Sequence, residues 1–298
     1  AIIIDSFPWF KELVNQLVLG LGFVENDVLE KANRLYGIGC SLDVAGTRFS
    51  CVLVILAFLS MKIVRTEKKQ WIWLYLLSFF AISVIGNIIA RTTIVGVGLA
   101  MLVWLIGAVA DRQADGNRFF ILQRWIAVGI VAVIVCSLLY TESPVFKDNF
   151  RFGFEGFFSL FETGRWETNS NNILKNMIVF PDNLHTWIIG DGYFDNPFNR
   201  DMNYIGPNFG GYYMATDIGY LRFLFYFGLI GLLLFCVYMV ACANELMKRF
   251  PAYSWMFFCI LLINFIVWIK VSTDIFVVMA IFLCLREPGN GETEESLL

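Results

Sequence analysis

The chain has 298 residues, of which 58% are hydrophobic and only 16% are charged, and its formal net charge is -3. Soluble domains of this length rarely combine so much apolar character with so few charges, whereas multipass membrane proteins do. The small negative charge gives no reason to expect nucleic acid as a partner.

Residues 1–45 are predicted to form an outer N-terminal segment that contains an interfacial helix. The opening stretch AIIIDSFPWFKELVNQLVLGLGF is mildly amphipathic, but it carries charges and Pro8. It therefore fits the membrane surface better than the membrane interior. We expect no signal peptide, because no basic region precedes an apolar core. The first residue is Ala1, so we expect the chain to be N-terminally truncated.

Later segments are apolar and long enough to cross a bilayer. The seven predicted spans are residues 46–64, 71–89, 92–110, 122–140, 216–244, 252–269 and 271–286. Four of them (46–140) precede a long loop, 141–215, and three (216–286) follow it. The expected fold is therefore all-α: a polytopic helical membrane protein with about seven transmembrane helices and a large outer loop.

Lysine and arginine predict the orientation of these spans, because short cytoplasmic loops are enriched in both. The cations that follow the first, third, fifth and seventh spans are Lys62, Arg65, Lys68, Lys69, Arg112, Arg118, Arg124, Lys248, Arg249 and Arg286. With seven spans, all of them fall on one side, which we assign to the cytoplasm. The loop 141–215 is then periplasmic, and residues 287–298 form a disordered cytoplasmic tail.

The loop 141–215 is too long for a plain connector. It is rich in aromatic residues and has glycine clusters at 190–194 and 206–213. The stretch 163–180 (TGRWETNSNNILKNMIVF) predicts a helix with Thr163 as its N-cap. We expect this loop to form a cap that lies on the membrane.

Histidine and cysteine give little sign of a metal or a disulfide site. The only histidine is His185, no CxxC pair occurs, and six of the seven cysteines lie in apolar runs. The thiols are therefore expected to be small buried hydrophobes. A solvated or structural role is favoured for His185 over a general base, and Asp191 is favoured as a turn former.

Arginine dominates the cations expected on the outer side. These arginines are Arg34, Arg48, Arg91, Arg151, Arg165, Arg200 and Arg222. Their rigid forked donors suit phosphate and carboxylate groups, and Arg48, Arg91 and Arg222 stand at helix starts, which also favour anions. The alternative is that each arginine reaches the headgroups or pairs with a loop carboxylate. Convergence of several on one cavity would favour an anion site.

Asp217 and Arg222 open the predicted span 216–244. Five residues apart on a helix, they would point about 140° away from each other. We therefore expect each to find its partner elsewhere. The nearby Gly219, Gly228 and Gly231 are expected to be close-packing positions.

Several short motifs follow one another in an order that resembles a known family. They are Arg91-Thr92-Thr93, Gly164-Arg165-Trp166, Gly190-Asp191-Gly192, and Asp217-Ile218-Gly219-Tyr220-Leu221 followed by Gly228-Leu229-Ile230-Gly231. This order resembles the bacterial O-antigen polymerase and O-antigen ligase superfamily, most closely the polysaccharide repeat-unit polymerases, over residues 40–245. The ligases have a histidine where this chain has Asp217, which favours a polymerase or an inactive relative.

The resemblance implies a glycosyltransferase of the bacterial inner membrane. Such an enzyme polymerises undecaprenyl-pyrophosphate-linked oligosaccharide repeat units of O-antigen, capsule or exopolysaccharide on the periplasmic face, without a metal or another cofactor. The resemblance implies that Arg91 and Arg165 hold the pyrophosphate, and we expect Arg222, at the start of the fifth predicted span, to join them. The expected catalytic residues are Asp217, as the base, and Arg165.

The expected partners are the lipid-linked oligosaccharide, membrane lipid and a chain-length regulator protein. Two alternatives stay open at this point. The first is a ligase that transfers the glycan to an acceptor lipid. The second is a polytopic transporter without catalysis, although the charges gather at the predicted outer mouth and not at the centre of the spans.

Overall fold

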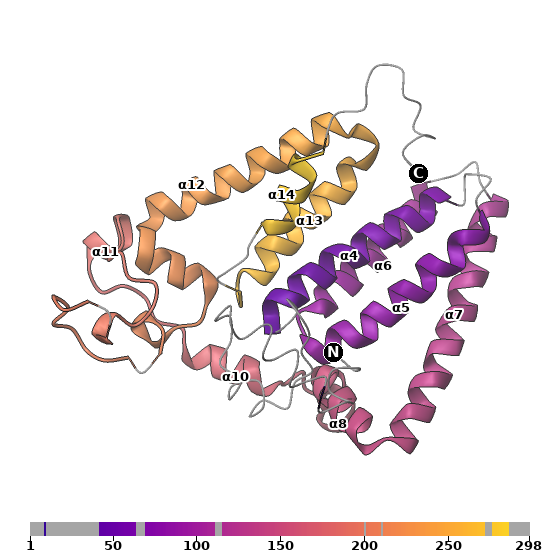
Figure 1. The fold of residues 1–298 in the computed structure, drawn as a ribbon, viewed down its shortest axis with the longest axis horizontal. Coiled ribbons are helices and arrows are strands. Elements are labelled where there is room, and N and C mark those ends of the chain that lie inside the picture. The colour runs from indigo at the N-terminus through magenta and orange to yellow at the C-terminus, as the bar shows by residue number, and fades with distance from the viewer. Residues whose placement is uncertain are drawn as a thin grey trace. The chain divides into compact units, whose positions relative to one another are not determined.

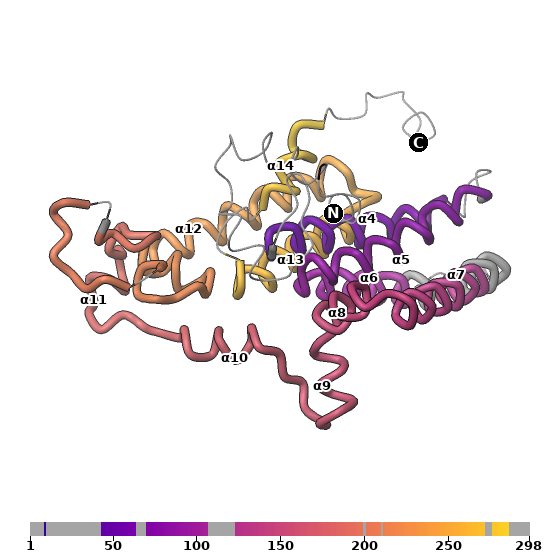
Figure 2. The backbone as a smooth tube through the Cα atoms, turned by 60° about the horizontal axis from the view of Figure 1, so that its bottom comes forward, coloured from indigo at the N-terminus to yellow at the C-terminus, as the bar shows by residue number. Residues whose placement is uncertain are grey.

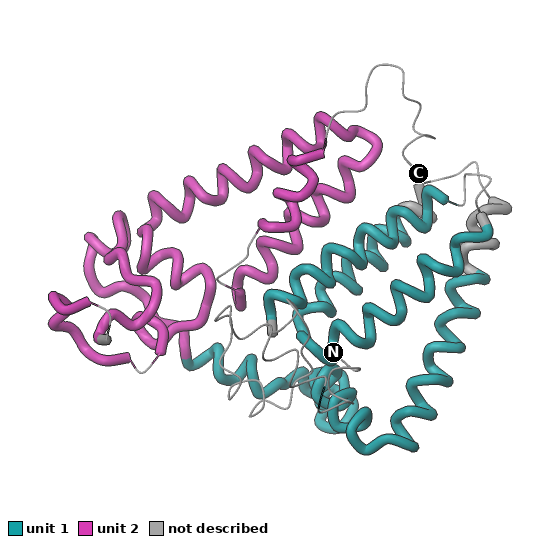
Figure 3. Tube along the Cα trace, in the orientation of Figure 1, with its two compact units in different colours: residues 1–176 teal, residues 177–298 magenta. Residues whose placement is uncertain are grey.

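A computed structural model describes Trp9 and residues 42–63, 69–110, 115–199, 201–209, 211–271 and 276–285. The described residues are helical or irregular, and they contain no strand beyond an isolated bridge between Asp195 and Tyr212. The all-α class is therefore confirmed. The predicted outer segment 1–45 lies almost wholly outside the described residues, and the predicted tail 287–298 lies wholly outside them. Contacts divide the chain into two compact units, residues 1–176 and 177–298 (Figure 3).

The first unit is built from apolar helices followed by three short helices. Its helices are α4 (Leu42–Ile63), α5 (Ile72–Ile89), α6 (Thr93–Ala110), α7 (Asp115–Glu142), α8 (Pro144–Gly153), α9 (Glu155–Thr163) and α10 (Asn169–Asn176). α4 packs against both α5 and α6 (Figure 1). A side chain at Gly96 would collide with the Ser50 backbone, so glycine permits the close approach of α4 and α6. Beyond α8, α9 projects away from these long helices (Figure 2).

The second unit is built around α12. Its helices are α11 (Leu184–Ile188), α12 (Gly219–Arg249), α13 (Ser254–Val267) and α14 (Val277–Leu283). α12 packs against the other three. Trp268 is fully buried, and its ring lies 4.5 Å from Tyr220 and 4.8 Å from Phe223. Gly219 contacts the Trp268 backbone so closely that a side chain there would collide with the Trp268 carbonyl. The close-packing role predicted for Gly219 is therefore confirmed.

Each of the seven predicted spans overlaps a helix, but these helices differ in length. Four are long and apolar enough to cross a membrane: Asp43–Ile63, Ile72–Ile89, Gln123–Glu142 and Gly219–Arg249. α6 and α13 supply shorter apolar stretches, Thr93–Ile106 and Pro251–Val267, and α14 has only 7 residues. These lengths indicate a membrane protein with four candidate spanning helices among the described residues. Seven spans, and a periplasmic position of the long loop, stay predictions.

The predicted span 216–244 overlaps a candidate spanning helix, but that helix is not continuous. The helix begins at Gly219 and is interrupted at Gly228, where φ is 67° and ψ is -173°. In a straight helix Phe223 and Phe235 would be about 18 Å apart, yet their rings lie 5.1 Å apart. α12 therefore consists of two helices, 219–227 and 229–249, which fold back on each other at Gly228 (Figure 1).

The helix predicted over 163–180 is also shorter than expected. Thr163 is the last residue of α9, which Gly164 ends with a φ of 72°. α10 covers only Asn169–Asn176, and the Thr168 hydroxyl caps it by accepting the Asn171 N–H at 3.2 Å. Glycine in the left-handed conformation is a common helix end, so the Thr-Gly pair marks a stop where we predicted a start.

Candidate functional sites

The predicted site residues are divided between the two units. Arg91 and Arg165 belong to the first unit, and Asp217 and Arg222 belong to the second. Each unit gathers polar groups in one place: a cavity beside Arg91 in the first, and a cluster around Arg222 in the second. The two places are built differently.

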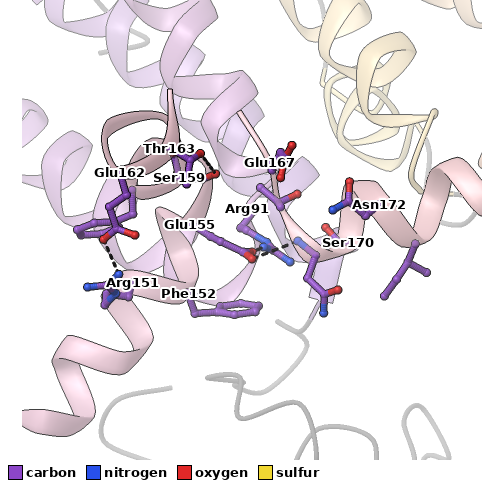
Figure 4. A pocket seen from close by; sticks show the side chains of 14 residues that line it. Arg91, Arg151, Phe152, Glu155, Ser159, Glu162, Thr163, Glu167, Ser170 and Asn172 are labelled. Carbon is purple, nitrogen blue, oxygen red and sulfur yellow. Dashed lines mark hydrogen bonds and ion pairs between the residues drawn. The ribbon is translucent and has the colours of Figure 1, made fainter. Parts of the chain in front are cut away.

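The cavity of the first unit has a volume of about 860 Å³. Its walls come from α8, α9, the start of α10 and the turn between α5 and α6 (Figure 4). The lining side chains are Arg91, Arg151, Phe152, Glu155, Phe158, Ser159, Glu162, Thr163, Glu167, Thr168, Asn169, Ser170, Asn172 and Ile173. The lining therefore combines carboxylates, hydroxyls and amides with two arginines, and two phenylalanine rings supply apolar faces.

Arg91 enters this cavity from the turn between two apolar helices. α5 ends at Ile89, and the extended Ala90 (φ -150°) redirects the chain. The guanidinium donates to the Glu155 carboxylate and lies over the Phe152 ring, 4.5 Å from its centre. Glu155 also accepts the Asn169 N–H at 3.1 Å. Glu155 thus links the end of a membrane helix to the starts of α9 and α10.

A second ion pair stands on the cavity wall. Arg151 donates to Glu162 at 2.7 Å, and its guanidinium lies 4.9 Å from the centre of the Phe158 ring. The hydrogen bond to Glu162 raises the pKa of the Arg151 guanidinium above its usual value. Each lining arginine is therefore paired with a glutamate. The third glutamate of the lining, Glu167, makes no ion pair within the described ranges, so the lining is slightly acidic.

Arg165 does not line the cavity. Its backbone is held in the turn after α9, because its carbonyl accepts the Ser159 hydroxyl at 2.9 Å and its N–H donates to Thr163 at 3.4 Å. Its side chain is exposed. The geometry does not bring Arg165 and Arg91 together on one ligand-sized surface, so the role that the resemblance implies for Arg165 stays a prediction.

Arg222 is buried within its own cluster in the second unit. Its side chain is only 4% exposed and donates to Asp195 at 3.0 Å and to Asp217 at 3.4 Å. The guanidinium also donates to the Phe194 carbonyl at 3.3 Å. It is stacked between the rings of Phe194, at 4.0 Å, and Tyr212, at 3.8 Å. These contacts hold Phe194, Asp195, Tyr212 and Asp217 against α12. The geometry therefore favours a structural role, and pyrophosphate binding stays a prediction.

The expectation that Asp217 and Arg222 cannot pair is wrong. That expectation placed both residues on one helix, but α12 begins at Gly219 and Asp217 precedes it. The helical angle between side chains therefore does not apply. Arg222 reaches back to Asp217 instead.

The Gly-Asp-Gly turn at 190–192 closes the break in α12. The N–H groups of Asp191 and Gly192 donate to the carbonyls of Phe225 (2.6 Å) and Tyr226 (3.3 Å). These carbonyls end the first half of α12 and would otherwise lack partners. Gly190 and Gly192 have φ of 85° and 75°, which suits glycine. Sequence reasoning singled out the turn and Gly228 separately but missed that they form one assembly.

The Asp191 side chain holds this turn in place. Its two carboxylate oxygens accept the Thr186 hydroxyl at 2.6 Å and the Tyr213 hydroxyl at 3.0 Å. Burial, with help from the bond to Asp191, raises the pKa of Tyr213. The predicted turn-forming role of Asp191 is confirmed. His185 is exposed on the neighbouring α11, and no group of three or more His, Cys, Asp or Glu in the described part of the chain is arranged to hold a metal ion.

No protein-family model matches this chain, and no curated protein and no solved structure is significantly similar to it. The resemblance to O-antigen polymerases therefore depends on the order of its motifs.

Proposed function

We propose that this protein is a membrane glycosyltransferase that polymerises undecaprenyl-pyrophosphate-linked oligosaccharide repeat units. The observation that carries this proposal is the cavity of the first unit. Its volume of about 860 Å³ lies in the usual range for small-molecule sites. Inner-membrane location and a periplasmic active site are part of the proposal and follow the resemblance.

The lining of the cavity suits a saccharide. Sugar hydroxyls both donate and accept hydrogen bonds, and this lining offers carboxylate acceptors, arginine donors, and amides and hydroxyls that do both. The rings of Phe152 and Phe158 offer apolar faces for sugar rings. A bare pyrophosphate fits less well, because glutamates already neutralise both arginines.

Arg91 has the best position to meet a lipid-linked substrate. It follows α5, which is apolar enough to span a membrane, so it lies where such a span ends. The phosphate groups of a lipid-linked sugar occupy that same level, and arginine is well suited to hold them. We therefore assign the sugar to the cavity and the pyrophosphate to its Arg91 edge.

In the proposed reaction, an acceptor hydroxyl attacks the anomeric carbon of the donor glycan. The bond from that carbon to the pyrophosphate oxygen breaks, and undecaprenyl pyrophosphate leaves. A carboxylate takes the proton of the acceptor hydroxyl, and arginine stabilises the charge on the leaving group. The resemblance assigns the proton to Asp217, and the cavity offers Glu167 as the alternative.

The test is surface-glycan analysis in the source strain with single variants at these positions. Arg91→Ala, Glu167→Gln and Asp217→Asn are compared at equal membrane levels, and Arg249→Ala is the control. Arg249 also pairs with a glutamate, Glu245 at 2.9 Å, but it is the last residue of α12. We expect Arg91→Ala to abolish the polymer ladder and to leave single-repeat material.

The same gels separate the remaining alternatives. Loss of the ladder in only one of the two carboxylate variants identifies the base. Loss of all glycan-capped lipid, including single repeats, would indicate ligase activity instead. A normal ladder in Arg91→Ala at normal protein level would contradict the assignment of the cavity.

A transporter is the second candidate, because α12 is interrupted at Gly228 and discontinuous helices are typical of transporters. In a transporter, the free backbone groups of such a break often bind the cargo. Here the carbonyls of Phe225 and Tyr226 accept hydrogen bonds from the 190–192 turn, which weakens that alternative. Purified protein in liposomes separates the two: an enzyme lengthens fluorescent lipid-linked oligosaccharide, whereas a transporter moves it without changing its length.

A further inference from the structure

The second half of α12 has one exposed apolar face and one buried face. The exposed side chains are Leu229 (40%), Ile230 (55%), Leu233 (62%), Leu234 (64%) and Val237 (65%). The buried side chains Met239, Ala243 and Leu246 are fully covered. The exposed residues recur with the helical period, so they form a stripe along one side. In a helix of this hydropathy such a stripe faces lipid.

A second group of exposed apolar side chains lies on and beside α11, which packs against α12. Three α11-region side chains, Leu184 (77%), Ile188 (45%) and Ile189 (60%), are exposed, and so is Phe180 (59%). A side chain at Gly228 would collide with the backbone of Ile188 and Ile189, so the end of α11 touches the break itself. Figure 1 shows α11 at the end of α12 where the break lies.

α11 presents these side chains from an ordered turn. Asn183 caps it by accepting the Thr186 N–H at 2.9 Å. The Trp187 indole donates to the Pro181 carbonyl at 2.8 Å, and the Phe180 ring stacks on Trp187 at 6.1 Å. With these polar groups satisfied internally, the turn can lie at a lipid boundary at little cost.

If Lys248 and Arg249 in the last turn of α12 lie at one edge of the hydrocarbon layer, the length of the second half of α12 brings the break to the other edge. At about 1.5 Å per residue, residues 229–249 rise about 30 Å, which matches the thickness of that layer. α11 then falls in the interfacial layer, where tryptophan side chains such as Trp187 are enriched.

We propose that α11 and Phe180 form a lipid-contact surface that lies in the interfacial layer of the bilayer and anchors the Gly-Asp-Gly turn there. Lipid is the occupant, because the exposed side chains are apolar and the end of α11 contacts α12 at the break, beside a helix that is apolar enough to span a membrane. Through the hydrogen bonds of residues 191 and 192 to the α12 carbonyls, this anchor fixes the depth of the fold-back at Gly228. The lipid contact does not depend on the glycosyltransferase assignment.

The test is fluorescence quenching in liposomes with the full chain. An environment-sensitive fluorescent amino acid is incorporated genetically at Leu184 or Ile189, which avoids labelling the native cysteines. Leu233, on the α12 stripe, is the lipid-facing comparator. Met202, which is 103% exposed on a loop tied by polar contacts of Asp201, is the aqueous comparator. Each sample is titrated with a doxyl-labelled lipid and with iodide.

We expect the labels at Leu184 and Ile189 to lose fluorescence with the doxyl lipid to the extent seen at Leu233, and to resist iodide. Iodide quenching at both positions to the extent seen at Met202 would overturn the proposal, because α11 would then lie in water. Protection from both quenchers would also overturn it, since a protein partner or a second copy would then cover the surface.

Discussion

Arg91 and Arg222 both stand where an apolar helix begins, but their surroundings differ. Arg91 lies on the wall of a cavity with one glutamate and one ring, and its side chain is 13% exposed. Arg222 is 4% exposed between two rings, and two aspartates and a carbonyl accept its hydrogen bonds. The same residue type can therefore be a ligand-binding group in one place and a clamp in another. What separates them is their placement: Arg91 lines a cavity, whereas Arg222 is enclosed between two rings.

The largest expected effect comes from Gly228→Ala, which tests whether the Arg222 region depends on the break in α12. At φ 67° and ψ -173° a side chain is strained by about 1–3 kcal/mol, and the methyl group would also collide with the Ile188 carbonyl. We expect a loss of about 3 kcal/mol or more, seen as a lower unfolding midpoint in detergent. The control is Gly98→Ala in α6, where nothing lies near the added methyl group. Equal midpoints for the two variants would show that the break is dispensable.

Arg222→Ala should have the next largest effect. It leaves Asp195 and Asp217 without the cation that joins them and removes two ring contacts. Breaking a buried pair costs about 3–5 kcal/mol, but these aspartates are 43% and 39% exposed, so we expect about 2–3 kcal/mol. Arg222→Lys should recover little, because an ammonium group lacks the flat fork that stacks and bridges.

The matched control for Arg222 is Arg249→Ala. The ion pair between Arg249 and Glu245 is exposed and joins residues one turn apart on α12. Loss of this pair should therefore lower the free energy of unfolding by about 0.5 kcal/mol. If both variants shift the unfolding midpoint equally, the clamp described for Arg222 does not stabilise the protein.

Arg91→Ala should change the stability of the protein little but its function strongly. Glu155 keeps the hydrogen bond from Asn169 and is 34% exposed, so we expect a loss of only about 1 kcal/mol. The polymer ladder, in contrast, should disappear. If Arg91→Ala lowers the unfolding midpoint as much as Arg222→Ala does, Arg91 is a structural residue like Arg222 and the distinction between the two arginines is lost.

The helices could be predicted from the sequence because an apolar run of sufficient length is a local signal. The predicted span 71–89 became Ile72–Ile89, and 92–110 became Thr93–Ala110. The break at Gly228 could not be predicted in this way. The carbonyls of Phe225 and Tyr226 before it accept hydrogen bonds from Asp191 and Gly192, which lie 34 residues earlier in the chain. Gly228-Leu229-Ile230-Gly231 alone is typical of close helix packing.

The arrangement of the charges was even less accessible from the sequence. The partner of Arg91 is Glu155, 64 residues away, and no local pattern relates the two. For Asp217 and Arg222 the pattern was local but misleading, because a helix start three residues later than predicted changes the direction of Asp217. Which arginines line a cavity depends on such tertiary placement, and residue type alone does not determine it.

Arg165→Ala should have the smallest effect on stability, and it sharpens the comparison most. Its side chain is exposed, and the contacts of its turn are made by its backbone, so alanine should change the free energy of unfolding by less than about 0.5 kcal/mol. The glycan gel then isolates function from folding. Loss of the ladder at an unchanged unfolding midpoint would assign Arg165 to substrate, as the Gly-Arg-Trp motif implies. A normal ladder would exclude Arg165 from the substrate site and leave Arg91 and Arg151, the two arginines that line the cavity, as the candidates.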